Sequence, residues 1–352
     1  MTATFIASTS HNQALEMKQV AITGTREVEI ASVPEPTAVD DWAKVRVESA
    51  PLCTEYRAWE TGRSGTLGHE AAGEVVAVAQ PGDVAVGDRV VVMPQHPCGT
   101  CELCRTGDYI HCQHNYDFKS YTGQDTGNRT MAQYLLKQDW LLVPIPDGIS
   151  YDHAAMACCG LGPTFGACDR MNVVGHHTVL ITGGGPVGLG GVINATHRGA
   201  RVIVSEPTPY RQELALELGA DDVVNPLEDD VDTVTSLTDG TGVDAVIECS
   251  GIPAAQRMAI DVVNRRGQIT FVGEGGNVAL DVSNDLIRKG IDLHGQWHYN
   301  RGLAPDIMSV IGRERAKLET FITHRCSFDG IGEAFSHQAD QRTGKVVLHP
   351  WD

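Results

Sequence analysis

The chain has 352 residues, which is enough for two domains that each bury a sizeable core. Its composition, 42% hydrophobic and 20% charged, is that of an ordinary globular protein. Against 27 basic side chains stand 45 acidic ones, and the formal net charge of −18 repels phosphate backbones. The charge therefore argues against a nucleic-acid partner, including a zinc-finger binder.

No stretch of eighteen apolar residues occurs, so we expect no membrane span and no membrane partner. Residues 1–16 lack a basic start and an apolar run, and we interpret them as an N-terminal extension that is no signal peptide. The ten cysteines cluster locally and none lies in the first fifty residues, unlike a secreted disulfide framework. We therefore expect a cytoplasmic protein whose fold begins near Met17.

From Lys18 to about Pro144 the sequence shows short alternating strands separated by Gly, Pro and Asp. Residues 42–47, 73–79 and 88–92 are clear examples. This alternation predicts a mainly antiparallel β region, and we assign residues 1–160 to this first domain. A cysteine-rich lobe, residues 95–115, is inserted in it.

Four cysteines in the lobe are spaced as metal ligands. Thiolates at Cys-x2-Cys-x2-Cys spacing can converge on one tetrahedral ion, and a fourth cysteine closes the shell. Four protein ligands leave no open position, so the spacing predicts a structural zinc. A four-cysteine iron–sulfur cluster is the alternative that the spacing leaves open. The four residues are Cys98, Cys101, Cys104 and Cys112.

At about Thr178 short apolar strands begin to alternate with helical stretches. The clearest strands are residues 179–182, 201–205, 245–249 and 268–272. An amphipathic stretch, residues 210–219, ends at a glycine, as helices commonly do. The alternation predicts a doubly wound parallel sheet of the Rossmann type over residues 161–298. Residues 299–352 are predicted to return to the first domain through a strand at 345–348.

The first strand of this sheet runs directly into Gly-Gly-Gly-Pro-Val-Gly at residues 183–188, and a helix follows. Glycines there permit a tight turn and let the backbone approach a pyrophosphate at the helix N-terminus. Glu206 ends the second strand, where a carboxylate accepts hydrogen bonds from ribose hydroxyls and repels a 2′-phosphate. NAD is therefore favoured over NADP, although the guanidinium of Arg211 could tolerate a phosphate. The predicted cofactor contacts are Gly183, Gly185, Pro186, Val187, Gly188, Glu206, Arg211 and Gly273.

Further fragments complete a known constellation: Cys53, the triplet Gly68-His69-Glu70 and the triplet Cys158-Cys159-Gly160. With the cysteine lobe, the glycine-rich turn and residues 246–251, they resemble the zinc-dependent medium-chain dehydrogenase/reductase family of alcohol and polyol dehydrogenases. The resemblance covers nearly all of the chain from Met17 onward. It implies an α/β protein with a GroES-like, mainly antiparallel β catalytic domain and a Rossmann cofactor domain.

The resemblance implies a catalytic zinc held by Cys53, His69 and Cys159, with Cys158 as the competing candidate for the third position. Glu70 is expected beside these ligands or as an occasional ligand. Two zinc ions per chain, one catalytic and one structural, are therefore expected. An open position on a catalytic zinc binds a substrate hydroxyl and lowers its pKa, so that a hydride can pass to the nicotinamide.

The proton relay departs from the family pattern. The family commonly has Ser or Thr two residues after the zinc cysteine and then Asp, whereas this chain reads Cys53-Thr54-Glu55-Tyr56. Two hypotheses remain open: Thr54 and Glu55 occupy the family's relay roles, or Glu55 itself takes the proton.

The substrate is less clearly encoded. Trp59 and Glu60 resemble the aromatic–acid pair of polyol dehydrogenases, and residues 296–300 are aromatic and hydrogen-bonding. A polar pocket suits a polyol, sugar alcohol or cyclitol, so we expect NAD-dependent oxidation of a secondary alcohol to a ketone. A threonine, amino-alcohol or simple alcohol dehydrogenase and a non-catalytic nucleotide-binding relative are the alternatives.

The resemblance also implies a homodimer or homotetramer joined through an edge strand, predicted at residues 291–295. Trp297 and Tyr299 could equally bury their area in that interface.

Overall fold

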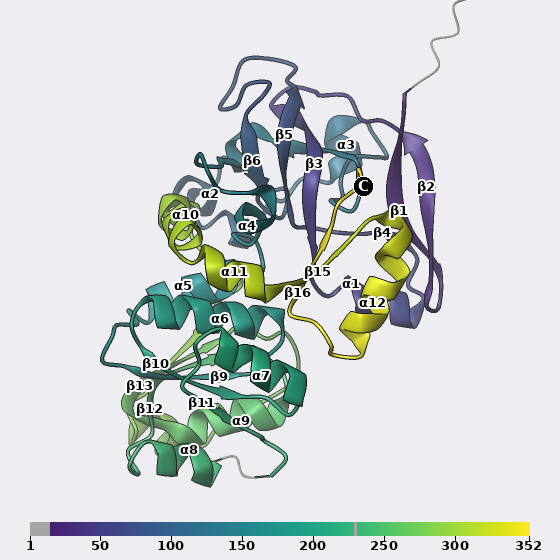
Figure 1. Cartoon of the computed structure of the whole chain (residues 1–352). Coiled ribbons are helices and arrows are strands. Elements are labelled where there is room, and N and C mark those ends of the chain that lie inside the picture. Colours follow the sequence, from purple (N-terminus) through teal and green to yellow (C-terminus); the bar gives the residue numbers. More distant parts are fainter. Residues whose placement is uncertain (1–14, 229–230) are drawn as a thin grey trace, which may run out of the picture.

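The computed structural model describes residues 15–228 and 231–352, which form two domains (Figure 1). Most of the predicted N-terminal extension, residues 1–14, lies outside the described residues. The first strand, β1, begins at Glu16, beside the predicted start at Met17.

The catalytic domain contains two β-sheets. A three-stranded sheet has the order β2-β1-β4, and a larger sheet has the order β15-β16-β3-β5-β6-β8, with β7 paired to β3. All pairs in this domain are antiparallel except β15 with β16. Their bounds are β1 Glu16–Gly24, β2 Glu27–Pro34, β3 Trp42–Leu52, β4 Gly65–Thr66, β5 Ala71–Ala77, β6 Arg89–Val92, β7 Tyr134–Gln138, β8 Leu142–Pro144, β15 Ile322–Cys326 and β16 Lys345–Leu348.

Short helices connect and cover these strands. Helix α1 follows β3, and α12 packs beside it (Figure 1). The helices are α1 Glu55–Thr61, α2 Glu102–Arg105, α3 Phe118–Thr122, α4 Tyr151–Ala155, α5 Gly162–Arg170, α10 Ala304–Arg313, α11 Arg315–Phe321 and α12 Ile331–Ala339. Single helical turns are η1 Tyr109–His111, η2 Asp139–Leu141, η4 Arg301–Leu303 and η5 Phe328–Gly330.

The cofactor domain is a parallel sheet of the order β11-β10-β9-β12-β13-β14 with helices on both faces. Figure 1 shows α6 and α7 on one face and α8 and α9 on the other. The strands are β9 Thr178–Thr182, β10 Arg201–Ser205, β11 Asp222–Val224, β12 Val243–Glu248, β13 Val263–Phe271 and β14 Asp292–Gly295. The helices are α6 Pro186–His197, α7 Pro209–Glu217, α8 Val231–Leu237, α9 Pro253–Val262 and the π-helix η3 Val282–Ile287.

The predicted fold class is confirmed: an antiparallel β domain is joined to a doubly wound parallel sheet. Strands β10 and β16 coincide with the predicted strands 201–205 and 345–348, and β14 is the sheet edge predicted at 291–295. Helix α7 stops at Glu217, two residues before Gly219, whose φ is +107°. Glycine adopts a positive φ at little cost because it has no Cβ, and such a residue commonly follows the end of a helix. No helix in the described residues is long and apolar enough to cross a membrane.

The two domains share one apolar core at their seam. Its buried side chains come from β6, from α4 and α5, from β9 and β10 and from β16. The segment from α4 to α5, which carries Cys158 and Cys159, is therefore packed on both sides, and α5 contacts α6. Packing of this kind holds a turn in one position.

We predict that Gly190→Ala destabilises the apoprotein, because a Cβ at Gly190 of α6 would lie 1.8 Å from the carbonyl oxygen of Gly160. Moving α6 away from this segment is expected to cost about 1–3 kcal/mol, seen as a lower Tm. Gly185→Ala is the matched control, since its Cβ meets no atom within 4 Å. Equal melting temperatures for the two variants would contradict the close-packing argument.

Candidate active site and metal centres

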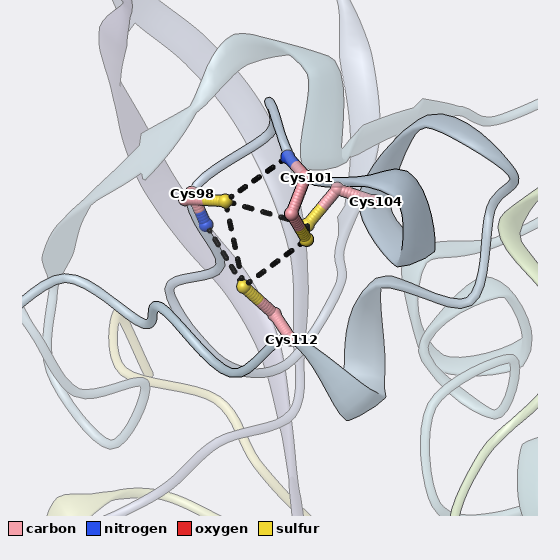
Figure 2. A group of neighbouring side chains, drawn as sticks. All are labelled: Cys98, Cys101, Cys104 and Cys112. Atoms are coloured by element: carbon pink, nitrogen blue, oxygen red, sulfur yellow. Dashed lines mark hydrogen bonds between the residues drawn. The ribbon is translucent and has the colours of Figure 1, made fainter.

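The four cysteines of the lobe converge on one point. Figure 2 shows their sulfurs turned toward one another. Four sulfur–sulfur distances are 3.9 Å for Cys98–Cys104, 3.4 Å for Cys101–Cys104, 3.9 Å for Cys101–Cys112 and 3.6 Å for Cys98–Cys112. A tetrahedron with metal–sulfur bonds of about 2.3 Å has edges of about 3.8 Å. The sulfurs therefore fit a single ion, whereas a multi-iron cluster would hold them farther apart.

Backbone amides point at two of these sulfurs, those of Cys98 and Cys112. The N–H of Cys101 donates to the sulfur of Cys98 at 3.4 Å, and those of Cys98 and His114 donate to the sulfur of Cys112 at 3.4 and 3.3 Å. Donors directed at sulfur favour the thiolate, which is the form that binds metal.

A second cluster lies at the seam of the domains. The ligand atoms of Cys53, His69, Glu70 and Cys159 all lie within 4.8 Å of one another. Cys53 follows β3, His69 and Glu70 precede β5, and Cys159 lies between α4 and α5. The Nε2 atom of His69 is 3.3 Å from the sulfur of Cys159 and 3.9 Å from Oε1 of Glu70. Two thiols, an imidazole and a carboxylate suit a zinc ion.

The seam position belongs geometrically to Cys159. Cys158 is fully buried, and its thiol donates to the backbone oxygen of Val92 at 3.4 Å. A hydrogen bond from Cys159 lowers the pKa of the Cys53 thiol and raises that of Cys159. The two sulfurs are thus close enough to share a proton, which a bound cation would displace.

Glu55 holds His69 in position. Its carboxylate is buried; Oε1 lies 2.9 Å from Nδ1 of His69, and Oε2 accepts from the N–H of Cys53 at 2.7 Å. Although burial raises it, the charge of His69 leaves the pKa of Glu55 lowered overall. A carboxylate on one ring nitrogen directs the other toward a metal. Glu55 is thus placed to position His69, and its part in the proton relay stays a prediction.

Glu70 and Lys345 form a fully buried ion pair beside the cluster. The Nζ of Lys345 donates to Oε1 of Glu70 at 2.7 Å, and the N–H of Cys159 donates to Oε2 at 3.1 Å. Burial raises the pKa of Glu70 to about 7, although Lys345 lowers it. The sequence analysis missed Lys345. The available signal was a lysine opening an otherwise apolar strand, Lys-Val-Val-Leu.

A cavity of about 660 Å³ opens over Cys53, His69 and Cys159 and is walled by both domains. A second cavity of about 400 Å³ runs along the glycine-rich turn to Glu206 and Arg211. The two cavities share wall residues and therefore adjoin. The shared residues are Cys53, Thr54, Arg57, Val187, Cys249 and Ser250.

The glycine-rich turn fits a dinucleotide. Gly183 follows β9 with φ +88°, and a Cβ at Gly188 would lie 1.8 Å from the oxygen of Gly183. At Gly185, which directly precedes α6, the space that a Cβ would occupy is open. Pro186 and Val187 also line this groove, and Gly273 lines the metal-site cavity. The turn therefore leaves room for a pyrophosphate at the N-terminus of α6.

Glu206 is fixed at the end of β10. Its Oε2 accepts from the N–H of Gly184 at 2.7 Å and its Oε1 from that of Thr208 at 2.9 Å. Arg211 lines the same groove, burial lowers its pKa, and its Nε has no hydrogen-bond partner within the described ranges.

Some of the residues predicted to contact substrate are buried in the core, and others line the cavity. Trp59 is buried against Phe335 at a centroid distance of 6.0 Å and does not line the cavity, because α1 turns it toward α12. Glu60 pairs with Arg26 instead. Trp297 and His298 do line the cavity, whereas Tyr299 is buried. His298 belongs to the segment 296–300 that the sequence indicated, whereas Arg57 and Gln95 are cavity residues that sequence analysis did not single out.

Two family models match the chain: the alcohol dehydrogenase GroES-like domain over residues 39–147 and the zinc-binding dehydrogenase model over residues 186–312. L-threonine 3-dehydrogenase of Pyrococcus horikoshii is 33% identical, over 94% of this chain and 98% of that protein. The chain belongs to the zinc-dependent medium-chain dehydrogenase family. The predicted resemblance is thereby confirmed.

Other members of the family are similarly related. Sorbitol dehydrogenase of Bacillus subtilis is 32% identical, over 97% of this chain and 99% of that protein. The solved alcohol dehydrogenase TADH from Thermus sp. ATN1 superposes with a TM-score of 0.85 at 25% identity, over 95% of this chain and all of that one. A zinc-binding dehydrogenase from Sinorhizobium meliloti bound to NADP superposes with a TM-score of 0.81 at 25% identity, over 96% and 100% of the two chains.

We predict two zinc ions per chain in the purified dehydrogenase, measured by mass spectrometry of the metals. His69→Ala is expected to keep one ion and to lose turnover, whereas Cys104→Ser loses the lobe ion and lowers the Tm because metal binding stabilises the folded lobe. Finding iron, or one zinc in the wild type, would contradict the two-site assignment.

We predict that Glu55→Gln weakens zinc binding at the cavity site by about 10–100-fold, because the charge that orients His69 is removed. Competition with a chelator measures the affinity. Glu60→Gln, on the same helix but paired with Arg26 near the surface, is the control and is expected to bind zinc as the wild type does. An unchanged affinity in Glu55→Gln would show that His69 does not need this partner.

Proposed function

We propose that this dehydrogenase oxidises a secondary alcohol, polyol-like in character, to a ketone with NAD as hydride acceptor. The observation that carries the proposal is the junction of two cavities, one over the Cys53–His69–Cys159 cluster and one along the glycine-rich turn. A substrate at the cluster and a nicotinamide in the groove would meet at that junction.

Cys53, His69 and Cys159 are the residues that would hold the catalytic zinc, with Glu70 beside them. A zinc ion with three protein ligands supplies a Lewis acid that lowers the pKa of an alcohol. Glu55 orients His69, and the Glu70 carboxylate fixes the backbone of Cys159. These contacts preorganise the ligands before substrate arrives.

The proton of the alcohol must leave as the hydride leaves. Thr54 follows Cys53 directly, is exposed and lines both cavities. Its hydroxyl can accept a hydrogen bond from the substrate oxygen and donate another toward the cofactor groove. We therefore propose that Thr54 is the first member of the relay.

Glu206 supports the choice of NAD. Glu206 directly follows β10, and its carboxylate lies in the groove, where it would accept hydrogen bonds from ribose hydroxyls and repel a 2′-phosphate. The NADP-bound relative from Sinorhizobium meliloti and the nearby Arg211 are the observations that favour NADP.

The polar groups Arg57, Gln95 and His298 in the cavity wall suit a substrate with several hydroxyls. Relatives named sorbitol dehydrogenase support a polyol, and the 33% identical L-threonine 3-dehydrogenases make an amino alcohol the second candidate.

The ten cysteines form no disulfide with one another, in keeping with a reducing cytoplasm. β14, at the edge of its sheet, is the expected contact of a homodimer or homotetramer.

The test is the initial rate of NAD reduction with polyols, cyclitols, simple alcohols and threonine, repeated with NADP. We expect turnover of polyols with NAD. If threonine alone is turned over, the proposed substrate is wrong and the proposed mechanism stands. If enzyme with full zinc occupancy turns over none of these compounds, the proposal is contradicted.

Glu206→Gln tests the cofactor preference. Removing the charge is expected to lower the ratio of kcat/KM for NAD to that for NADP by about tenfold or more, which corresponds to about 1.4 kcal/mol of lost discrimination. Glu217→Gln, exposed at the end of α7, is the control and is expected to leave the ratio unchanged. An unchanged ratio in Glu206→Gln would assign the preference to another residue.

A further inference from the structure

A third cavity, of about 280 Å³, adjoins the active site on the side of the catalytic domain. It shares His69, Pro94 and Gln95 with the cavity over the cysteine–histidine cluster. The two cavities are therefore neighbours, with these three residues between them. The catalytic function proposed above does not use the third cavity.

A buried lysine forms part of its wall. Lys137 of β7 is 3% exposed, and its Nζ donates to the backbone oxygen of Gln95. Among the residues that the structure describes, no carboxylate lies within ion-pair distance of this ammonium group. Burial lowers the pKa of Lys137 to about 7, as expected for an ammonium group without a counter-ion.

The other polar groups of the wall also lack acidic partners. Thr130 is 5% exposed, and its hydroxyl has no hydrogen-bond partner in the described part of the chain. Arg129, at an exposed position, forms no ion pair with any described residue.

Among the described residues, one acid lines the cavity, Asp117. It is exposed, and its carboxylate caps α3 by accepting from the N–H of Ser120 at 2.9 Å. The buried end of the cavity thus offers an amine, which a bound anion would hold in its charged form, and a hydroxyl with free hydrogen-bonding capacity. Burying such groups without a partner is costly unless a ligand supplies one.

We propose that this cavity binds a carboxylate of the substrate, which is then a polyhydroxy acid and not a neutral polyol. Lys137 would pair with the carboxylate, Thr130 would donate a hydrogen bond to it, and Arg129 would attract it from the rim. The proposal rests on the proposed function, because the secondary hydroxyl of the same molecule must reach the metal site. Its oxidation yields a keto acid, NADH and a proton.

The test uses matched pairs of six-carbon substrates, each a hexitol and the corresponding hexonate, with zinc-loaded enzyme. We expect the wild type to favour the hexonates by about tenfold or more, both in kcat/KM and in Kd from calorimetry with NADH present. Lys137→Met, which replaces the ammonium by an apolar group of similar length, is expected to lower the hexonate-to-hexitol ratio by the same factor. Lys119→Met, an exposed lysine paired with Asp125, is the control and keeps the ratio.

A role of Lys137 in holding Gln95 alone would change both members of a pair equally, so the ratio separates the two roles. Hexitol turnover without a hexonate preference, or a preference that survives in Lys137→Met, would overturn the carboxylate subsite and leave the proposed function standing. Hexonate binding that depends on Lys137, without turnover of any pair, would support the subsite and contradict the function. If Lys137→Met does not fold, Arg129→Gln at the rim is expected to lower the same ratio.

Discussion

The buried carboxylate of Glu70 is the contact on which the arrangement of the site depends. It joins the segment before β5 to the backbone of Cys159 and to Lys345 of β16, which lie far apart in the sequence. Removing one partner from a fully buried ion pair leaves an uncompensated charge, so the three segments are stable mainly in each other's presence. The return of the C-terminal strand to the catalytic domain, visible beside β3 in Figure 1, thus belongs to the active site as well as to the fold.

A second buried carboxylate, that of Glu55, positions the histidine of the cluster. Glu55 stands one residue closer to the zinc cysteine than the acid of the family pattern, yet it is a glutamate, one methylene longer than aspartate. From the start of α1 it reaches Nδ1 of His69 while also accepting from the N–H of Cys53. The shortened loop is therefore compatible with an oriented histidine, and in our proposal the relay begins at the exposed Thr54.

The formal net charge of the whole chain differs in sign from the charged side chains that line its cavities. The chain carries a formal charge of −18, but Arg57 lies where the substrate and cofactor cavities meet, and Lys137 and Arg129 line the third cavity. Buried or rim cations in a low-dielectric cavity act on a ligand more strongly than distant surface acids, which salt screens. An acidic protein can in this way receive an acidic cofactor and, as we propose, an acidic substrate.

The sequence by itself determined the features whose groups come from one short segment. The four cysteines of the lobe, the turn at residues 183–188 and the strands β10 and β16 are local, because spacing and periodicity alone bring their atoms together. Only the tertiary structure decided between Cys158 and Cys159, turned Glu55 toward His69, placed Trp59 in the core and paired Lys345 with Glu70. Neighbouring residues of a chain point in different directions, and which direction faces a cavity depends on packing between segments that are remote in sequence.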